Sequence, residues 1–143
     1  MGHIHVGYPE PNCFKNEDLV KWMDIYLGLP SILLDSDERR KKYYGTAGRY
    51  REKDFGVEYR TLSNFWTTND ELRQWIFKQT QKAYYAVENN VIIGQSFERS
   101  VRDAINNNNK EACLVLMTHF DVISNEELNK LMNSTIYDNT FAQ

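Results

Sequence analysis

The first residues of the chain alternate between polar and β-branched side chains. The run His3-Ile4-His5-Val6 ends at Gly7, which predicts a short strand that leads into a turn over residues 9–12. Residues 48–52 and 57–62 are two further strand candidates. The polar segment that joins them contains a glycine and suits a hairpin connection. The pattern therefore predicts three short strands, two of which form a hairpin.

Hydrophobic residues farther along the chain recur at helical spacing. Residues 17–27 predict a first helix, which Asn16 caps and which Gly28 and Pro30 end. Residues 31–44 predict a second helix that is less regular, since its apolar start is followed by a charged stretch. We expect the first helix to pack on the sheet.

Two capping boxes mark the starts of later helices. Thr68 with Glu71 opens the longest predicted helix, whose apolar face continues for about 20 residues. Ser124 with Glu127 opens a last short helix. Two more helices are predicted between these, at residues 95–106 and 111–120.

The order of these elements predicts an α+β fold, with an antiparallel sheet and helices packed on one of its faces. A chain of 143 residues with 41% hydrophobic residues has the size and composition of one globular domain. We expect a single domain over residues 1–143. Residues 1–66 hold the strand and loop motifs, and residues 67–143 form the helical part.

The charge balance limits the classes of partner. A formal net charge of -3 argues against a domain built mainly to bind nucleic acid, because such a domain is usually basic. The cations are nevertheless concentrated, with 7 of the 17 Lys and Arg residues between positions 39 and 53. This segment is the place to look for an anion site.

Features of secretion and membrane insertion are not apparent in the sequence. It has neither a signal-like N-terminus nor an apolar run of the roughly 20 residues that cross a bilayer. Cys13 and Cys113 are far apart and outside any C-x-x-C pair, so we interpret both as free thiols. The expected location is the cytoplasm, or the host cytoplasm if a phage encodes the chain.

Polar pairs on the predicted strands suggest the chemistry of one sheet face. Residues two apart in a strand point to the same side. A face shared by such pairs would bring together imidazoles, guanidiniums and one carboxylate, which suits phosphate and a divalent cation. The carboxylate and an imidazole could bind the cation, and the arginines could hold phosphoryl oxygens. The pairs are His3 and His5, Arg49 and Arg51, and Glu58 and Arg60.

Each pair also has a plainer interpretation. A single H-x-H near a terminus is most often a surface feature, R-x-R is usually a solvated strand face, and E-x-R is usually a salt bridge worth under ~1 kcal/mol. The charged run at residues 39–42 would by itself be a solvated helix face. The hypothesis therefore depends on the combination.

Five motifs in order along residues 2–66 give the chain a family resemblance. The sequence resembles the phage and bacterial carboxylate–amine ligases called type 2 amidoligases, which are distantly related to glutamine synthetase. The 11-residue motif at 56–66 is the most specific of the five, and weaker similarity continues through the C-terminal helices. The motifs are GHIHVGY at 2–8, LGLPS at 27–31, ERR at 38–40, YGTAGRYR at 44–51 and GVEYRTLSNFW at 56–66.

This resemblance implies an ATP-dependent ligase with a partial glutamine synthetase-like catalytic domain. A carboxylate would attack the γ-phosphate to give an acyl phosphate, and an amine would then displace phosphate. The resemblance assigns His3 and Glu58 to a magnesium ion and His5 to a nucleotide phosphate. It places Arg60 beside the transferring phosphoryl group or the carboxylate substrate.

The resemblance also assigns a phosphate-holding role to arginines from two segments. Arg49 and Arg51 lie on the first hairpin strand, and Arg39 and Arg40 lie in the charged run before it; either of the last two could face the site. Phosphoryl transfer needs alignment and charge stabilisation more than covalent help. The expected cofactors are ATP and Mg²⁺, and the expected substrates are a small-molecule or peptide carboxylate and an amine.

The resemblance further implies an earlier strand with acidic metal ligands, which this sequence lacks. We expect the chain to be the C-terminal portion of such a catalytic domain, completed by a partner chain or by self-association. A truncated or degenerate product is a second explanation. A non-catalytic module that binds phosphate, nucleotide or nucleic acid, or an assembly subunit, is the alternative function.

Overall fold

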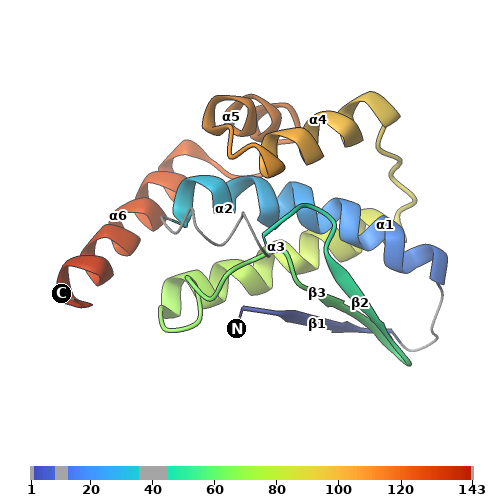
Figure 1. Cartoon of the computed structure of the whole chain (residues 1–143), viewed down its shortest axis with the longest axis horizontal. Helices are drawn as coiled ribbons and strands as arrows, with labels where there is room; N and C mark the ends of the chain where they lie inside the picture. Colours follow the sequence, from blue (N-terminus) through green and yellow to red (C-terminus); the bar gives the residue numbers. More distant parts are fainter. Residues whose placement is uncertain (1, 9–12, 36–44, 143) are drawn as a thin grey trace.

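The computed structural model describes residues 2–8, 13–35 and 45–142 and contains one three-stranded sheet (Figure 1). The strands are β1 (Ile4–Gly7), β2 (Tyr50–Lys53) and β3 (Gly56–Tyr59). Their order is β1-β3-β2, and both neighbouring pairs are antiparallel. The predicted strand near the N-terminus and the predicted hairpin are confirmed.

Helices make up most of the remaining structure, and together with the sheet they confirm the α+β class. The helical segments are α1 (Cys13–Met23), the π-helix η1 (Asp24–Gly28), α2 (Leu29–Leu34), α3 (Asp70–Glu88), α4 (Gln95–Asn106), α5 (Lys110–His119) and α6 (Asn125–Ala142). The bounds predicted for α4 agree with the structure, and those for α5 differ by one residue at each end. The last helix is longer than expected.

The first predicted helix does not end where the sequence indicated. The chain stays helical from α1 through η1 and α2, because Gly28 keeps right-handed helical angles (φ -62, ψ -48). Pro30 lies in the first turn of α2, where a missing N–H costs nothing. Asn16 was predicted as a cap, but it lies inside α1 and donates to the Gly56 carbonyl at 3.5 Å. The second predicted helix is described only as far as Leu34, and residues 36–44 lie outside the described part.

The two predicted capping boxes have different outcomes. Asn69 caps α3, since its side chain accepts a hydrogen bond from the Leu72 N–H at 2.9 Å; the proposed Thr68 cap was wrong by one residue. At the start of α6, the Ser124 hydroxyl accepts from the Glu127 N–H at 3.1 Å, as predicted. Neighbouring polar residues can both cap a helix, so the sequence alone does not choose between 68 and 69.

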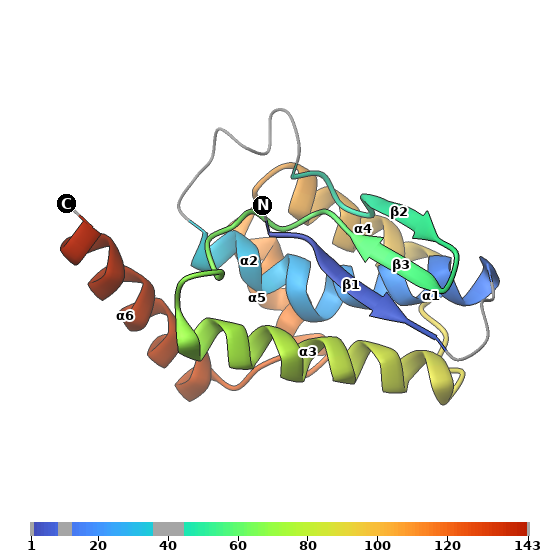
Figure 2. The ribbon, with the colours of Figure 1, turned by 90° about the horizontal axis from the view of Figure 1, so that it is seen from below.

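One face of the sheet packs on the helices and contributes to the core. Ile4, Val57 and Tyr59 lie on this face and are at most 9% exposed. Figure 1 shows the sheet on one side of the α1–α2 run, with α4 and α5 on the other. Figure 2 shows the strands in front of α1 and α2, with α3 alongside β1. The fold therefore consists of a small sheet, a middle layer of helices and an outer helical layer.

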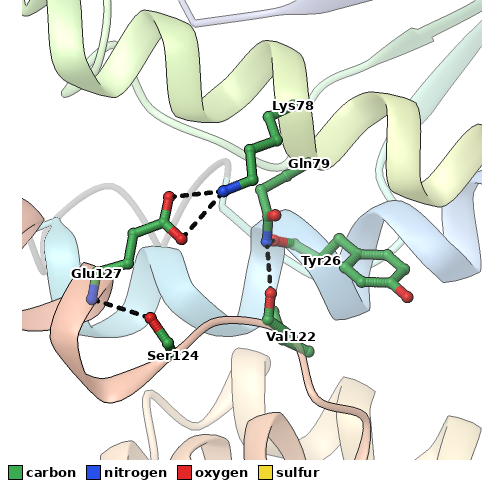
Figure 3. Close-up of polar contacts among 6 residues, drawn as sticks. All are labelled: Tyr26, Lys78, Gln79, Val122, Ser124 and Glu127. Carbon is green, nitrogen blue, oxygen red and sulfur yellow. Dashed lines mark hydrogen bonds and ion pairs between the residues drawn. The ribbon is translucent and has the colours of Figure 1, made fainter.

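Hydrogen bonds from α3 join three segments that are far apart in the sequence (Figure 3). The buried Gln79 amide donates to the Tyr26 carbonyl at 2.9 Å and to the Val122 carbonyl at 3.1 Å. Lys78 pairs with Glu127 at 3.1 Å on the exposed side. Because Gln79 satisfies two backbone carbonyls inside the core, it holds η1 and the segment before α6 against α3.

The membrane and cysteine predictions can be compared with the described residues. Among them, every helix is too short or too polar to cross a membrane. Cys113 is buried and outside any disulfide, as predicted. It packs in the core as a small apolar side chain.

Candidate functional site

The register of the sheet places three of the predicted site residues in one row. His5 on β1 and Arg51 on β2 are both paired with Glu58 on the central strand. Directly paired residues lie on the same face of an antiparallel sheet. This face is opposite the one that carries Tyr59 and packs on the helices. The row therefore lies on the outer face of the sheet.

Residues two positions along each strand extend the row on the same face. His3 precedes His5, Arg60 follows Glu58, and Arg49 precedes Arg51. The Arg60 N–H donates to the Arg49 carbonyl at 2.8 Å, so the two strands stay paired beyond their assigned ends. We call these six residues together with Lys53 the cationic face.

The segment before β2 is fixed by hydrogen bonds that position Arg49. The Ala47 N–H donates to the Asn106 side chain at 2.7 Å, and the Gly48 N–H donates to Asp24 Oδ1 at 3.1 Å. The Arg49 N–H donates to the Thr61 hydroxyl at 3.2 Å. The backbone that carries Arg49 is therefore tied to α4, to η1 and to the segment that follows β3.

Glu58 is the only carboxylate of the cationic face and is 6% exposed. His3 Nδ1 lies 2.8 Å from Glu58 Oε1, and Lys53 Nζ lies 3.3 Å from Glu58 Oε2. Burial by itself would raise the pKa of the Glu58 carboxyl. Hydrogen bonds from Lys53 and His3 and the charges of Lys53 and Arg51 outweigh burial, and the pKa lies below its usual value. Glu58 is therefore ionised at neutral pH and contacts the Lys53 ammonium and the His3 imidazole.

The remaining cations make the face suited to an anion. Arg49 and Arg51 are exposed, and Arg60 is half-buried. In Figure 2 the strands lie in front of α1 and α2, so in the described part of the chain these helices cover the other face of the sheet. Guanidiniums bind phosphate or carboxylate oxygens through paired N–H groups. An anion of several oxygens could bind several arginines at once.

Comparison with known proteins adds the family. A family model described as phage phiEco32-like COOH.NH2 ligase-type 2 matches residues 1–89. The chain belongs to this ligase family. The matched range covers all three strands and every predicted site residue. No curated protein and no solved structure matches the chain.

Within this ligase-type 2 chain, the predicted metal ligands meet as a pair. His3 and Glu58 are in contact, but in the described part of the chain no three His, Cys, Asp or Glu side chains gather as a metal site would need. Mg²⁺ is often held by one or two carboxylates together with water and substrate phosphates. The donors present fit an ion that arrives with phosphate and do not form a closed protein site.

This ligase-type 2 chain has one charged residue on the face that was predicted only as part of the cationic segment 39–53 and not as a site residue. Lys53 lies two positions after Arg51 on β2 and contacts Glu58. The two-residue spacing that identified the arginines also reaches Lys53, so the signal was present. Arg39 and Arg40, the other predicted phosphate ligands, lie outside the described residues.

A groove of about 580 Å³ continues the site on the far side of β1 in this ligase-type 2 chain. It runs between β1 and α3, and both His3 and His5 contribute to its lining. Phe77 and Tyr85 on α3 are 66% and 57% exposed, which is high for aromatic side chains. The groove offers an apolar surface next to the cationic face. Its aromatic lining residues are Trp66, Phe77, Tyr84 and Tyr85.

Proposed function

We propose that the chain is an ATP-dependent carboxylate–amine ligase that works through an acyl phosphate. The observation that carries this proposal is the cationic face: one buried carboxylate among two histidines, three arginines and a lysine, on strands of a ligase-type 2 chain. A polyphosphate matches this charge pattern better than a single carboxylate does, because it supplies many oxygens and several negative charges.

The proposed reaction has two steps, both of which involve negative oxygens. A carboxylate oxygen of the acid attacks the γ-phosphorus, an O–P bond forms, and the bond to the β-phosphate oxygen breaks to release ADP. The amine nitrogen then attacks the acyl carbon, phosphate leaves with the C–O bonding pair, and the nitrogen loses a proton to water. Arg49, Arg51 and Arg60 would hold the phosphoryl oxygens in line with the acid.

We propose that Glu58 and His3 also take part in holding Mg²⁺. A bound Mg²⁺ would neutralise charge between the phosphates. Glu58 would then exchange Lys53 or His3 for the ion, and both of these partners are less buried than Glu58 itself. His5, which is exposed in the same row, would contact a phosphate oxygen.

We propose that the groove beside β1 receives part of a substrate. A group attached to an anion bound on the cationic face would enter the groove past His3 and His5. Its aromatic lining suits an apolar or planar group of a small molecule or peptide. The two donors seen for the metal lead us to propose that a partner chain or a second copy supplies the rest of the site.

A second candidate function is a non-catalytic phosphate or nucleotide module. It is favoured by the contacts of both Glu58 oxygens, one with His3 and one with Lys53, which leave an anion site that needs no metal. Such a module would bind nucleotide but would not activate an acid. Acyl phosphate formation separates the two candidates.

The proposal is tested by trapping the activated acid with hydroxylamine, which replaces the amine. We expect coloured ferric hydroxamates to form from at least one acid in a panel of amino acids and short peptides, and only with both ATP and Mg²⁺. Glu58→Gln and Arg60→Ala should lower the rate at least 100-fold, since removing one transition-state charge contact typically costs this much.

Matched changes far from the strands serve as controls. Glu111→Gln on α5 and Arg99→Ala on α4 alter exposed side chains with the same change of charge, and they should keep the full rate. If Glu58→Gln and Arg60→Ala both retain full turnover, the assignment of the site is wrong. Tight ATP binding without hydroxamate in any acid would favour the non-catalytic module.

A further inference from the structure

A second cavity, of about 320 Å³, lies on the helix side of the sheet. It is enclosed by α1, η1, α4 and the segment that leads into β2. Asp24, which is 3% exposed, contributes a carboxyl to a wall of this cavity. Apolar side chains make up much of the remaining wall. They are Val20, Ile25, Ile93 and Val101.

Asp24 is placed there by an unusual piece of backbone. It is the first residue of the π-helix η1, and single π turns occur often at functional sites. Asp24 Oδ1 accepts a hydrogen bond from the Tyr59 hydroxyl at 2.6 Å and from the Gly48 N–H at 3.1 Å. A Cβ atom added to Gly48 would lie 3.8 Å from Asp24 Oδ2, so that oxygen lies beside another residue of the cavity wall. The carboxyl is thus held at a fixed position.

The charge of Asp24 is only partly compensated. Burial raises its pKa to about 6, while the hydrogen bonds from Tyr59 and Gly48 and the charge of Arg102 lower it. Asp24 is therefore mostly ionised at neutral pH, in a place that disfavours charge. A buried carboxylate of this kind gains free energy from a cation.

None of the other charged side chains that line the cavity is buried with Asp24 as a cationic partner. Lys21 is paired with Glu98 at 3.5 Å, and Glu17 and Arg102 are exposed. All four belong to the lining, and two of them are acids. The cavity therefore combines one buried carboxylate, apolar walls and a solvated rim that carries both signs of charge.

We infer that this cavity binds a small organic cation, a primary ammonium group on a short alkyl chain. The ammonium would pair with Asp24, and the chain would lie against Val20, Ile25 and Val101. The cavity differs from the cationic face, because Tyr59 and Glu58 are adjacent in β3 and point to opposite faces of the sheet. The inference is therefore independent of the proposed ligase activity.

The test is an NMR titration of the whole chain with hexylammonium, beside hexanol and hexanoate of the same length. We expect hexylammonium to bind with a Kd of about 1 mM, a usual strength for a ligand of this size. The Gly48 amide resonance should shift during the titration, since this N–H donates to Asp24. Hexanol and hexanoate should bind at least about tenfold more weakly, because neither can pair with a carboxylate as a cation does.

Two variants and a control assign the binding to the cavity. Asp24→Asn keeps an oxygen for Tyr59 and Gly48 but removes the charge, and it should weaken hexylammonium binding at least about tenfold. Ile93 is a half-buried residue of the cavity wall, and Ile93→Trp should fill part of the cavity while leaving Asp24 unchanged. Asp103→Asn, an exposed carboxylate elsewhere on α4, should leave binding unchanged. Equal binding of hexanoate, no shift at Gly48, or unchanged affinity in both cavity variants would overturn the inference.

Discussion

Replacing Gly56 by alanine should separate β1 from β3 and lower the free energy of unfolding by about 3 kcal/mol or more. A Cβ atom at Gly56 would lie 1.8 Å from the Val6 carbonyl oxygen and 2.9 Å from the Gly7 Cα. Both neighbours are backbone atoms of the paired strand, so no side-chain rotation relieves the overlap. Urea denaturation of the variant beside the native chain measures the loss.

The same substitution should also impair the candidate site. β1 carries His5 and leads on from His3, so its displacement removes both imidazoles from the cationic face and breaks the contact between His3 and Glu58. Gly94→Ala is the matched control, because the nearest atom to a Cβ there is 3.9 Å away and the residue is exposed. A Gly56→Ala variant as stable as Gly94→Ala would contradict the strand pairing on which the site depends.

The double replacement Arg49→Ala with Arg51→Ala should weaken ATP binding by at least about two orders of magnitude. Each arginine supplies charge-assisted hydrogen bonds, and the loss of one such partner costs about 1.5–3 kcal/mol. Both side chains are exposed, so the variant should remain folded. Equilibrium titration with a fluorescent ATP analogue at constant ionic strength measures the change.

A second double variant separates a local contact from a change of net charge. Arg99→Ala with Lys110→Ala removes two exposed cations from α4 and α5, away from the sheet, and should lower the affinity only slightly. Similar losses of affinity in the two double variants would mean that ATP is attracted by the net charge of the chain and not by contacts with Arg49 and Arg51. That result would remove the arginines from the proposed site.

The strands and the arrangement of the cationic face could be predicted from the sequence, because strand geometry has a period of two. Once β1 and β2 both pair with β3, the spacing of His3 and His5 or of Arg49 and Arg51 decides which face they share. The glycine between β2 and β3 indicated the hairpin, whereas the pairing of β1 with β3 became visible only in the structure. Lys53 follows the same spacing, and a stricter count along β2 would have included it.

The end of the first helix could not be predicted in the same way. Gly28 and Pro30 usually end a helix, but here tertiary packing favours its continuation. A Cβ at Gly28 would lie 2.8 Å from the Ile105 side chain and 3.2 Å from the Tyr59 hydroxyl. The glycine thus permits close packing in the core and does not end the helix. That long-range contact has no local signal.

The cavity around Asp24 could not be predicted from the sequence for a similar reason. Asp24 lies among apolar residues of helical spacing, and nothing nearby identifies its partners. Tyr59 is 35 residues away and Gly48 is 24 residues away. The choice of Asn69 as the α3 cap also involves a distant residue, since its amide donates to the Ser134 hydroxyl at 2.9 Å. Such pairs become visible only when the elements are placed in space.

We propose above all that Glu58 and the cations around it form a site for magnesium-bound ATP. Calorimetric titration of the 143-residue chain with ATP, with and without Mg²⁺, tests it most directly when the native chain is compared with Glu58→Gln. We expect Mg²⁺ to strengthen ATP binding to the native chain at least about tenfold and to have little effect on Glu58→Gln, which lacks the charged ligand. The same Mg²⁺ dependence in both proteins, or no ATP binding to either, would contradict it.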